Sequence, residues 1–217
     1  GASTGQKIRY VLISPSASGV TAAVPTRTSP LYNGPISIST SVIVRAAVFS
    51  ADHTVQGLEA NAQYLKIGAP LAASAAQLPV LVLDDHGLGA LTKDGIDHPA
   101  WLYTYASRGP GSAVFATTPA LATPLTMTVR GSSSASFPKK SYSLELTDPS
   151  GKKTALPLLG LPAASNWALV GPWFFDRTLI KNNFVYELST RLGHWAPHIQ
   201  LVEVFFNSRG GDLTDAS

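Results

Sequence analysis

Short runs typical of strands recur along this 217-residue chain, and only one segment has a helical period. Alternation is typical of strands, because successive side chains of a strand point to opposite faces of its sheet. Turns rich in Pro and Gly separate the runs. The sequence therefore predicts a mainly β fold with one clear helix.

The first 67 residues contain four such runs. They are "KIRYVLIS", the end of "SPLYNGPISIST" after a turn at Asn33–Pro35, "SVIVRAAVFSA" and "NAQYLKI". Short strands at this spacing predict a small β-sandwich. Residues 68–78 begin with the small, uncharged stretch "GAPLAASAAQ", which is typical of a linker. Residues 79–217 are then a second domain.

The composition excludes several classes of protein. Charged residues are only 13% of the chain and the formal net charge is +3, with Lys and Arg scattered rather than gathered in a basic stripe. This distribution argues against a nucleic-acid partner. The chain has no cysteine, so it has no disulfide, thiolate metal ligand or cysteine nucleophile. No apolar run reaches the length of a membrane span.

The second domain begins with more strand patterns and then changes period. The predicted strands are "LPVLVLDD", "AWLYTYAS", "SAVFATT", "PLTMTVRG", "KKSYSLEL", "NWALVGPW" and, last, "IQLVEVFFN". Between the last two lies the predicted helix, which Asp176 can cap and Gly193 can end. Its apolar stripe consists of Ile180, Phe184, Leu188 and Leu192.

Positive charges surround a loop of small hydroxyl residues between Val129 and Leu146. By strand alternation Lys140 shares a face with Tyr142, Leu144 and Leu146, whereas Lys139 points the other way. An unpaired ammonium on an apolar face is costly, so a bound anion would explain Lys140. The loop Gly131–Ser136 offers N–H groups and hydroxyls to phosphate oxygens, and Arg130 a bidentate contact. The alternative is a surface hairpin whose lysine extends to solvent at the sheet edge.

Glu187 lies at the edge of the helix's apolar stripe, where a carboxylate is placed to reach a lysine on a strand. A local pair with Arg191, four residues later, explains Glu187 equally well.

Other candidate groups favour structural interpretations. Pro197 lies between His194 and His198 and argues against a helical metal site. Asp84–Asp85 is interpreted as a turn with solvated carboxylates in preference to a calcium site. Trp101, Tyr103 and Tyr105 share a strand face, and core packing is favoured there over sugar binding.

Two segments resemble known families. Ile8–Tyr10, Thr28–Ile36 ("TSPLYNGPI") and Ile43–Phe49 ("IVRAAVF") resemble the C-terminal module of chitobiase and β-hexosaminidase. That resemblance implies an immunoglobulin-like β-sandwich for residues 1–67, with no catalytic residue.

Residues 79–207 resemble the spore-coat CotH kinase family through three motifs in order. These are "RGSSSASFPKKSYSLEL" (130–146), "LLGLPAASNWALVGPWFFDRTLIKNNFVYELSTRLG" (158–193) and "APHIQLVEVFFN" (196–207). The resemblance implies an atypical, α+β kinase-like fold that binds ATP with Mg or Mn and phosphorylates protein substrates, in a secreted or cell-surface protein. Its motifs place nucleotide-binding residues at Arg130, Ser132, Ser133, Lys139, Lys140, Asn182 and Glu187. Strand alternation favours Lys140 as the phosphate-binding lysine.

The chain departs from the family pattern at two places. Ser132 stands where the family has Asn, and a hydroxyl offers fewer hydrogen bonds than an amide. The family's catalytic and metal-binding acidic residues are expected beyond Ser217, so residues 79–217 are expected to be an incomplete kinase-like domain. Its partners are then a protein substrate or the remaining C-terminal half. The alternative is a non-catalytic extracellular protein that binds a surface glycan or has a structural role.

Overall fold

A computed structural model describes residues 5–14, 23–50, 59–106, 115, 118–173 and 176–214. The chain divides into two compact units. Unit 1 comprises Gly1–Ser74, Asp84–Gly89 and Phe206–Ser217, and unit 2 comprises Ala75–Leu83 and Ala90–Phe205. The predicted boundaries at residues 67 and 79 stay a prediction. The predicted strand "SAVFATT" falls largely on residues outside the described ranges.

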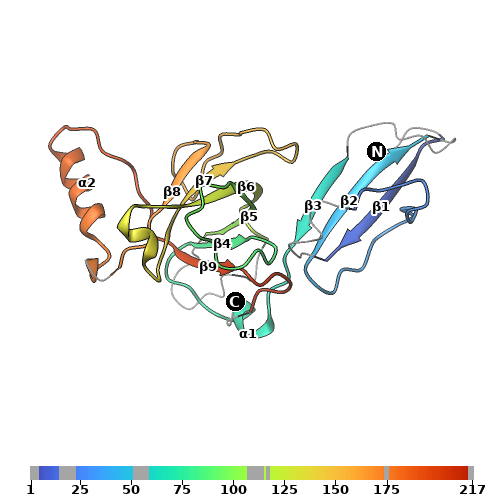
Figure 1. Ribbon diagram of the computed structural model, residues 1–217, viewed down its shortest axis with the longest axis horizontal. Coiled ribbons are helices and arrows are strands. Elements are labelled where there is room, and N and C mark those ends of the chain that lie inside the picture. Colours follow the sequence, from blue (N-terminus) through green and yellow to red (C-terminus); the bar gives the residue numbers. More distant parts are fainter. Residues whose placement is uncertain are drawn as a thin grey trace. The chain divides into compact units, whose positions relative to one another are not determined.

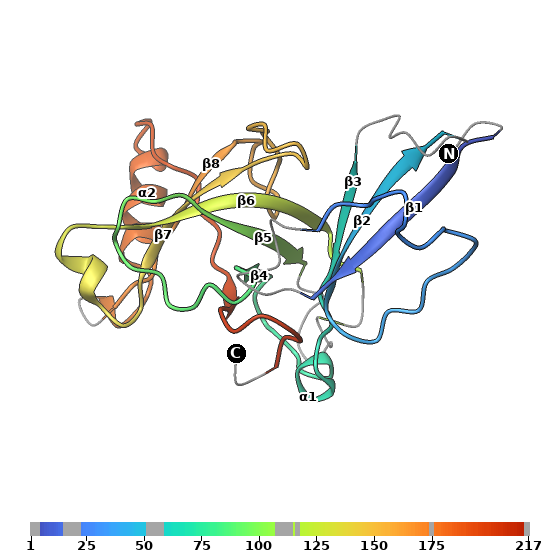
Figure 2. The same ribbon diagram turned by 45° about the vertical axis from the view of Figure 1, so that its right-hand side comes forward.

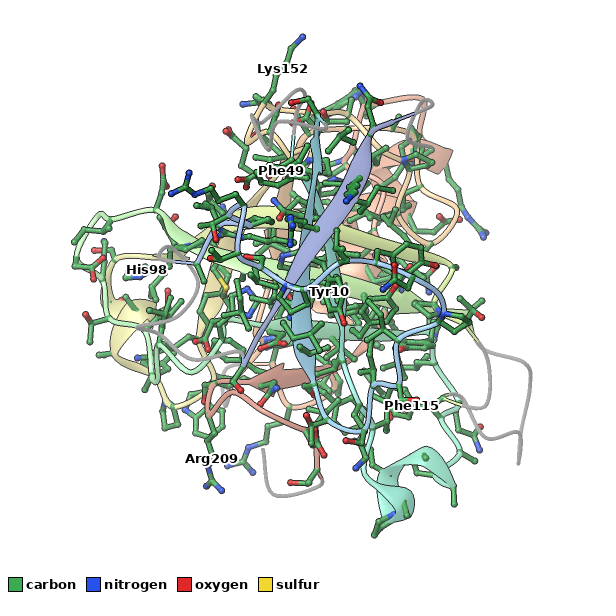
Figure 3. All side chains as sticks on the ribbon, turned by 90° about the vertical axis from the view of Figure 1, so that its right-hand side faces the viewer. Tyr10, Phe49, His98, Phe115, Lys152 and Arg209 are labelled. Atoms are coloured by element: carbon green, nitrogen blue, oxygen red, sulfur yellow. The ribbon has the colours of Figure 1, made fainter. Side chains whose placement is uncertain are left out.

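Unit 1 contains a three-stranded antiparallel sheet in the order β1-β2-β3 (Figure 1). The strands are β1 (Lys7–Ile13), β2 (Val42–Phe49) and β3 (Ala60–Tyr64). The buried side chains of β2 are Val42, Ile43, Ala47 and Phe49, and all but Val42 lie on the face opposite to Val44 and Ala46. Tyr10 on β1 and Phe49 on β2 are labelled in Figure 3. The described part of residues 1–67 thus contains one sheet, and the predicted β-sandwich stays a prediction.

The strand predicted after the Asn33–Pro35 turn is wrong, since residues 36–40 form no strand. The preceding residues have already paired with the free edge of β1. Tyr10 N–H donates to Pro30 across 3.1 Å, and Tyr32 N–H donates to Ile8 across 2.8 Å. Once that edge is satisfied, the residues after Pro35 have no strand beside them to continue the ladder.

Unit 2 is built around a six-stranded sheet in the order β8-β7-β6-β5-β4-β9 (Figure 1). The last residues of β4 and β9 belong to unit 1. The six strands are β4 (Val80–Asp84), β5 (His98–Tyr105), β6 (Leu121–Arg130), β7 (Ser141–Leu146), β8 (Asn166–Leu169) and β9 (Glu203–Asn207). The remaining elements are α1 (Ala69–Ala72) in unit 1 and, in unit 2, the 3₁₀ helix η2 (Ser133–Ser136) and α2 (Lys181–Arg191). The predicted mainly β fold with one clear helix is confirmed.

The alternation read from the sequence sets the core of the sheet. In β6 the buried side chains are Thr123, Leu125, Met127 and Val129, every second residue. Leu144 lies opposite Met127 and Leu146 lies opposite Leu125 on β7, and both leucines are buried. Burying a leucine of this kind stabilises a fold by about 2 kcal/mol.

The aromatic residues of β5 belong mainly to this core. Tyr103 is 3% exposed and Tyr105 is 6% exposed. Trp101 stacks on Tyr103 with ring centroids 6.4 Å apart, and Phe115 meets Tyr105 edge-on at 4.9 Å. The core interpretation is therefore confirmed for Tyr103 and Tyr105, whereas Trp101 is half-buried.

Helix α2 starts later than predicted. Asp176 does accept the Lys181 N–H at 3.0 Å, but Leu179, in the left-handed region at φ 59°, keeps residues 176–180 out of the helix. Gly193, at φ 81°, ends the helix as predicted. The predicted apolar stripe is not buried, because Phe184 is 64% exposed and α2 has no buried residue.

Candidate functional site

The loop between β6 and β7 is a tight, hydroxyl-rich turn. In Figure 2, β6 runs on into this loop, which carries η2. Ala135 N–H donates to Ser132 at 3.3 Å, and Phe137 N–H donates to Ser134 at 3.2 Å. A methyl group on Gly131, where φ is 109°, would lie 2.2 Å from Ser134 Oγ and 3.3 Å from Ala135 N. Only glycine fits this turn, which keeps its two ends close together.

Lys140 points back into this loop. Its Nζ donates to the Ala135 carbonyl at 3.0 Å, and the side chain is half-buried. Leu144 and Leu146, which alternation places on the same face, are buried as predicted. A lysine ammonium has three donors, and this contact uses one of them. The remaining donors can bind an anion at the loop.

Lys93, which the sequence analysis missed, reaches the other end of the same loop. Its Nζ donates to the Gly131 carbonyl. The antiparallel register of β5 and β6 explains this contact, because His98 lies opposite Met127 and the chain before His98 therefore runs toward Gly131. The sequence signal was weak, since Lys93 lies in a loop rather than in a periodic strand.

Asp94 fixes the turn that follows Lys93. Its carboxylate accepts the Ile96 N–H at 2.9 Å and lies 3.1 Å from His98 Nε2. The hydrogen bond from Ile96 is the main effect that holds the pKa of Asp94 below its usual value. The carboxylate is thus bound within its own turn.

The other predicted residues of the loop are accessible to a ligand. Arg130, Ser132, Ser133 and Lys139 are exposed. Among the described residues, no carboxylate forms an ion pair with Arg130, Lys139, Lys140 or Lys93. The loop and its flanks therefore carry uncompensated positive charge, which favours an anionic ligand.

The backbone of Lys139 and Lys140 is held by a close approach of Gly171. Gly171 N–H donates to Ser141 Oγ at 3.0 Å. A methyl group on Gly171 would lie 2.4 Å from the Lys140 carbonyl oxygen and 3.1 Å from that of Lys139. Glycine at this position lets the segment after β8 lie directly on the start of β7.

Two residues predicted for the site lie on α2. Glu187 accepts from Arg191 Nε at 2.8 Å, which is the local pair that the sequence analysis gave as the alternative. The structure therefore does not bring Glu187 and Lys140 together, because each side chain has another partner. Asn182 is exposed near the start of the helix. The nucleotide-binding roles of Asn182 and Glu187 stay predictions.

A separate polar cluster within unit 1 corrects the interpretation of Asp84–Asp85. Both carboxylates are 0% exposed, so the predicted solvated turn is wrong. Buried hydrogen bonds take the place of water. Gln63 Nε2 lies 2.7 Å from Asp84 Oδ2, and Asp85 Oδ1 accepts the Gly87 and Leu88 N–H groups.

His86 completes this cluster. Its N–H donates to Asp84 Oδ1 at 3.0 Å, its Nδ1 lies 3.3 Å from Gln63 Nε2, and its backbone is left-handed at φ 62°. Burial is the main effect on both titrating groups. It raises the pKa of Asp84 to about 6 and lowers the pKa of His86 to about 4. Each group is therefore held toward its neutral form.

No metal site is found in the part of the chain that the structure describes, where no group of three or more His, Cys, Asp or Glu is suited to hold an ion. In that same part, no helix is long and apolar enough to cross a membrane.

Comparisons with known proteins identify the segment that carries the loop. The family model for the CotH kinase protein matches residues 127–211, which include the loop, Gly171, α2 and β9. The predicted membership of this family is confirmed for this segment, which is kinase-like. Searches of curated proteins and of solved structures returned no match. The resemblance of residues 1–67 to the chitobiase-type module stays a prediction.

Proposed function

We propose that the β6–β7 loop binds the phosphates of ATP in a secreted or cell-surface CotH-type protein kinase that phosphorylates protein substrates. Lys140 is the residue on which this proposal depends. It lies in the matched segment, its ammonium is directed into the loop, and its described contact is to a neutral carbonyl rather than a carboxylate. Positive charge held in this way is stabilised by a bound phosphate.

The remaining loop residues have distinct roles in this proposal. Arg130 and Lys139 add charge on the two flanks of the loop, and Ser132 and Ser133 donate hydroxyl hydrogen bonds. Gly131 and Gly171 hold the backbone in the shape that presents these groups. Such a site positions phosphates and balances their charge, which is the main contribution of a protein to phosphoryl transfer.

Of the two cofactors that the family implies, ATP fits the described residues and the divalent metal does not. ATP fits, because its phosphates match the cationic, donor-rich loop. The CotH kinase family implies a divalent metal, Mg or Mn here, yet the described residues offer no carboxylate cluster for it. We therefore assign no step to a metal at this loop.

Transfer of label from [γ-³²P]ATP by the full-length protein tests the proposal. Wild type should label itself or an added protein substrate, and Lys140→Ala should reduce labelling at least about 100-fold, as expected for loss of a charged phosphate contact in a transfer reaction. Lys152→Ala is the matched control, because Lys152 is exposed on another turn and Figure 3 shows it projecting away from the fold. Equal labelling by wild type and Lys140→Ala would contradict the proposal.

A further inference from the structure

We propose that Lys93 is a second phosphate-binding lysine, which binds the same polyphosphate as Lys140 from the opposite end of the β6–β7 loop. This inference rests on the proposed function and extends the site to a segment before residue 127, where the match to the CotH kinase family begins. The sequence motifs did not include Lys93.

The contacts of the two lysines are equivalent. Lys93 Nζ donates to the Gly131 carbonyl, and Lys140 Nζ donates to the Ala135 carbonyl. These carbonyls are four residues apart in a loop whose tight turn keeps Gly131 and Ala135 close. Neither lysine pairs with a carboxylate among the described residues.

Two ammonium groups held on one turn repel each other, and a polyanion between them replaces repulsion with attraction. Each lysine keeps donors beyond the one that its carbonyl contact uses. A ligand with several linked negative groups can contact both lysines at once and carries more charge than a single carboxylate, so it balances the two ammonium groups together. This arrangement selects a polyphosphate, as in a nucleoside triphosphate.

The turn after Lys93 holds the lysine in position. Asp94 accepts the Ile96 N–H and pairs with His98 at 3.1 Å, and His98 is fixed in β5 opposite Met127. Leu91, 4% exposed, anchors the other side of Lys93 in the core. The one carboxylate next to Lys93 in sequence is thus held by its own turn, and Lys93 is placed before any ligand arrives.

Acetylation footprinting of the full-length protein tests Lys93 directly. Lysines are labelled with acetic anhydride with and without inorganic tripolyphosphate and quantified by mass spectrometry. We expect protection of both Lys93 and Lys140 and none of Lys152. Tripolyphosphate lacks the nucleoside, so the readout concerns phosphate binding alone.

Affinity for tripolyphosphate supplies the second measurement. Lys93→Met keeps the aliphatic stem but removes the charge, and should weaken binding roughly tenfold to a hundredfold. Lys93→Arg should restore most of the affinity, and Lys152→Met should match wild type. If affinity is lost in Lys93→Met and restored in Lys93→Arg, then the positive charge at residue 93 is responsible for binding, rather than a change in folding.

The outcomes separate this inference from the proposed function. Protection of Lys140 without Lys93, together with wild-type affinity in Lys93→Met, overturns the role of Lys93 and leaves the proposed function standing. Protection of neither lysine overturns both. Protection of Lys93 without Lys140 supports Lys93 as an anion ligand and overturns the central role of Lys140.

Discussion

The side-chain amide of Gln63 donates to the carboxylate of Asp84 across 2.7 Å, at a position where Asp84 has no solvent exposure. The same amide nitrogen lies 3.3 Å from His86 Nδ1. One amide group thus joins a buried carboxyl and a buried imidazole. Their proton affinities are shifted in opposite directions, which leads to two matched predictions.

Asp84→Asn should remove the pH dependence of stability that comes from Asp84. Burial raises the folded-state pKa of Asp84 from 3.8 to about 6, so its contribution to stability is full below pH 3.8 and is lost as pH rises through about 6. Without the contribution of Asp84, the free energy of unfolding of the variant should decrease relative to that of wild type as the pH falls from 6.5 to 4. The relative change is on the order of 3 kcal/mol.

Urea denaturation of both proteins between pH 4 and 7 measures this change. A difference between variant and wild type that stays constant over this range would contradict the assignment of the raised pKa to Asp84.

His86→Asn should have the opposite effect. Burial lowers the folded-state pKa of His86 from 6.5 to about 4, so its contribution is full above pH 6.5 and is lost as pH falls through about 4. Removing this contribution should make the variant lose stability relative to wild type as pH rises from 4 to 6.5. Asn tolerates the left-handed backbone at φ 62°, so the turn itself is retained.

The same urea titration serves for His86→Asn. If its stability relative to wild type rose with pH, His86 would carry a proton in the folded state, and the neutral imidazole inferred here would be wrong.

Asp212→Ala should destabilise unit 1 by about 1–3 kcal/mol, because it leaves a buried donor without an acceptor. Asp212 Oδ1 accepts the Ser41 N–H at 2.8 Å and lies 3.1 Å from Ser41 Oγ, and Ser41 is 3% exposed. Lys66 also pairs with Asp212, but its side chain is 52% exposed, so Lys66→Ala should cost less than about 1 kcal/mol. Thermal unfolding of both variants compares the two contributions, and equal losses would show that the ion pair dominates.

Gly171→Ala should weaken ATP binding and reduce stability by about 1–3 kcal/mol, because the new methyl group meets the Lys140 carbonyl at 2.4 Å. Gly151→Ala is a useful control. It has open space around it but a φ of 83°, so its cost is conformational and lies on another turn. Isothermal titration with ATP should separate the two variants. Unchanged affinity in Gly171→Ala would show that the backbone of Lys139 and Lys140 does not shape the site.

The sequence was most informative where one periodicity decides the structure. Alternation placed Leu144 and Leu146 on one face of β7, where both are buried, and the left-handed Gly193 ended α2 as its position predicted. Alternation does not predict burial that depends on residues distant in the sequence. Nothing local marks Asp84 as buried, because Gln63 and the segment after β9 come from distant parts of the chain.

The same limit explains the helix and the site. An apolar stripe shows which face a helix can bury, but not what covers it, so Phe184 and Leu192 are exposed although their spacing is regular. Lys93 was missed because its contact with Gly131 depends on the register of β5 and β6, which no single motif encodes. Ser132 and Ser133 could be proposed from the sequence because they lie within one continuous motif.

The dissociation constant for ATP of the full-length protein, compared between wild type and Lys140→Ala, tests the central claim most directly. We predict that wild type binds ATP and that Lys140→Ala binds it at least roughly tenfold more weakly, since a hydrogen bond to a charged group contributes about 1.5–3 kcal/mol. Lys152→Ala should match wild type. Equal affinities in Lys140→Ala and wild type would contradict the claim that the β6–β7 loop holds the phosphates.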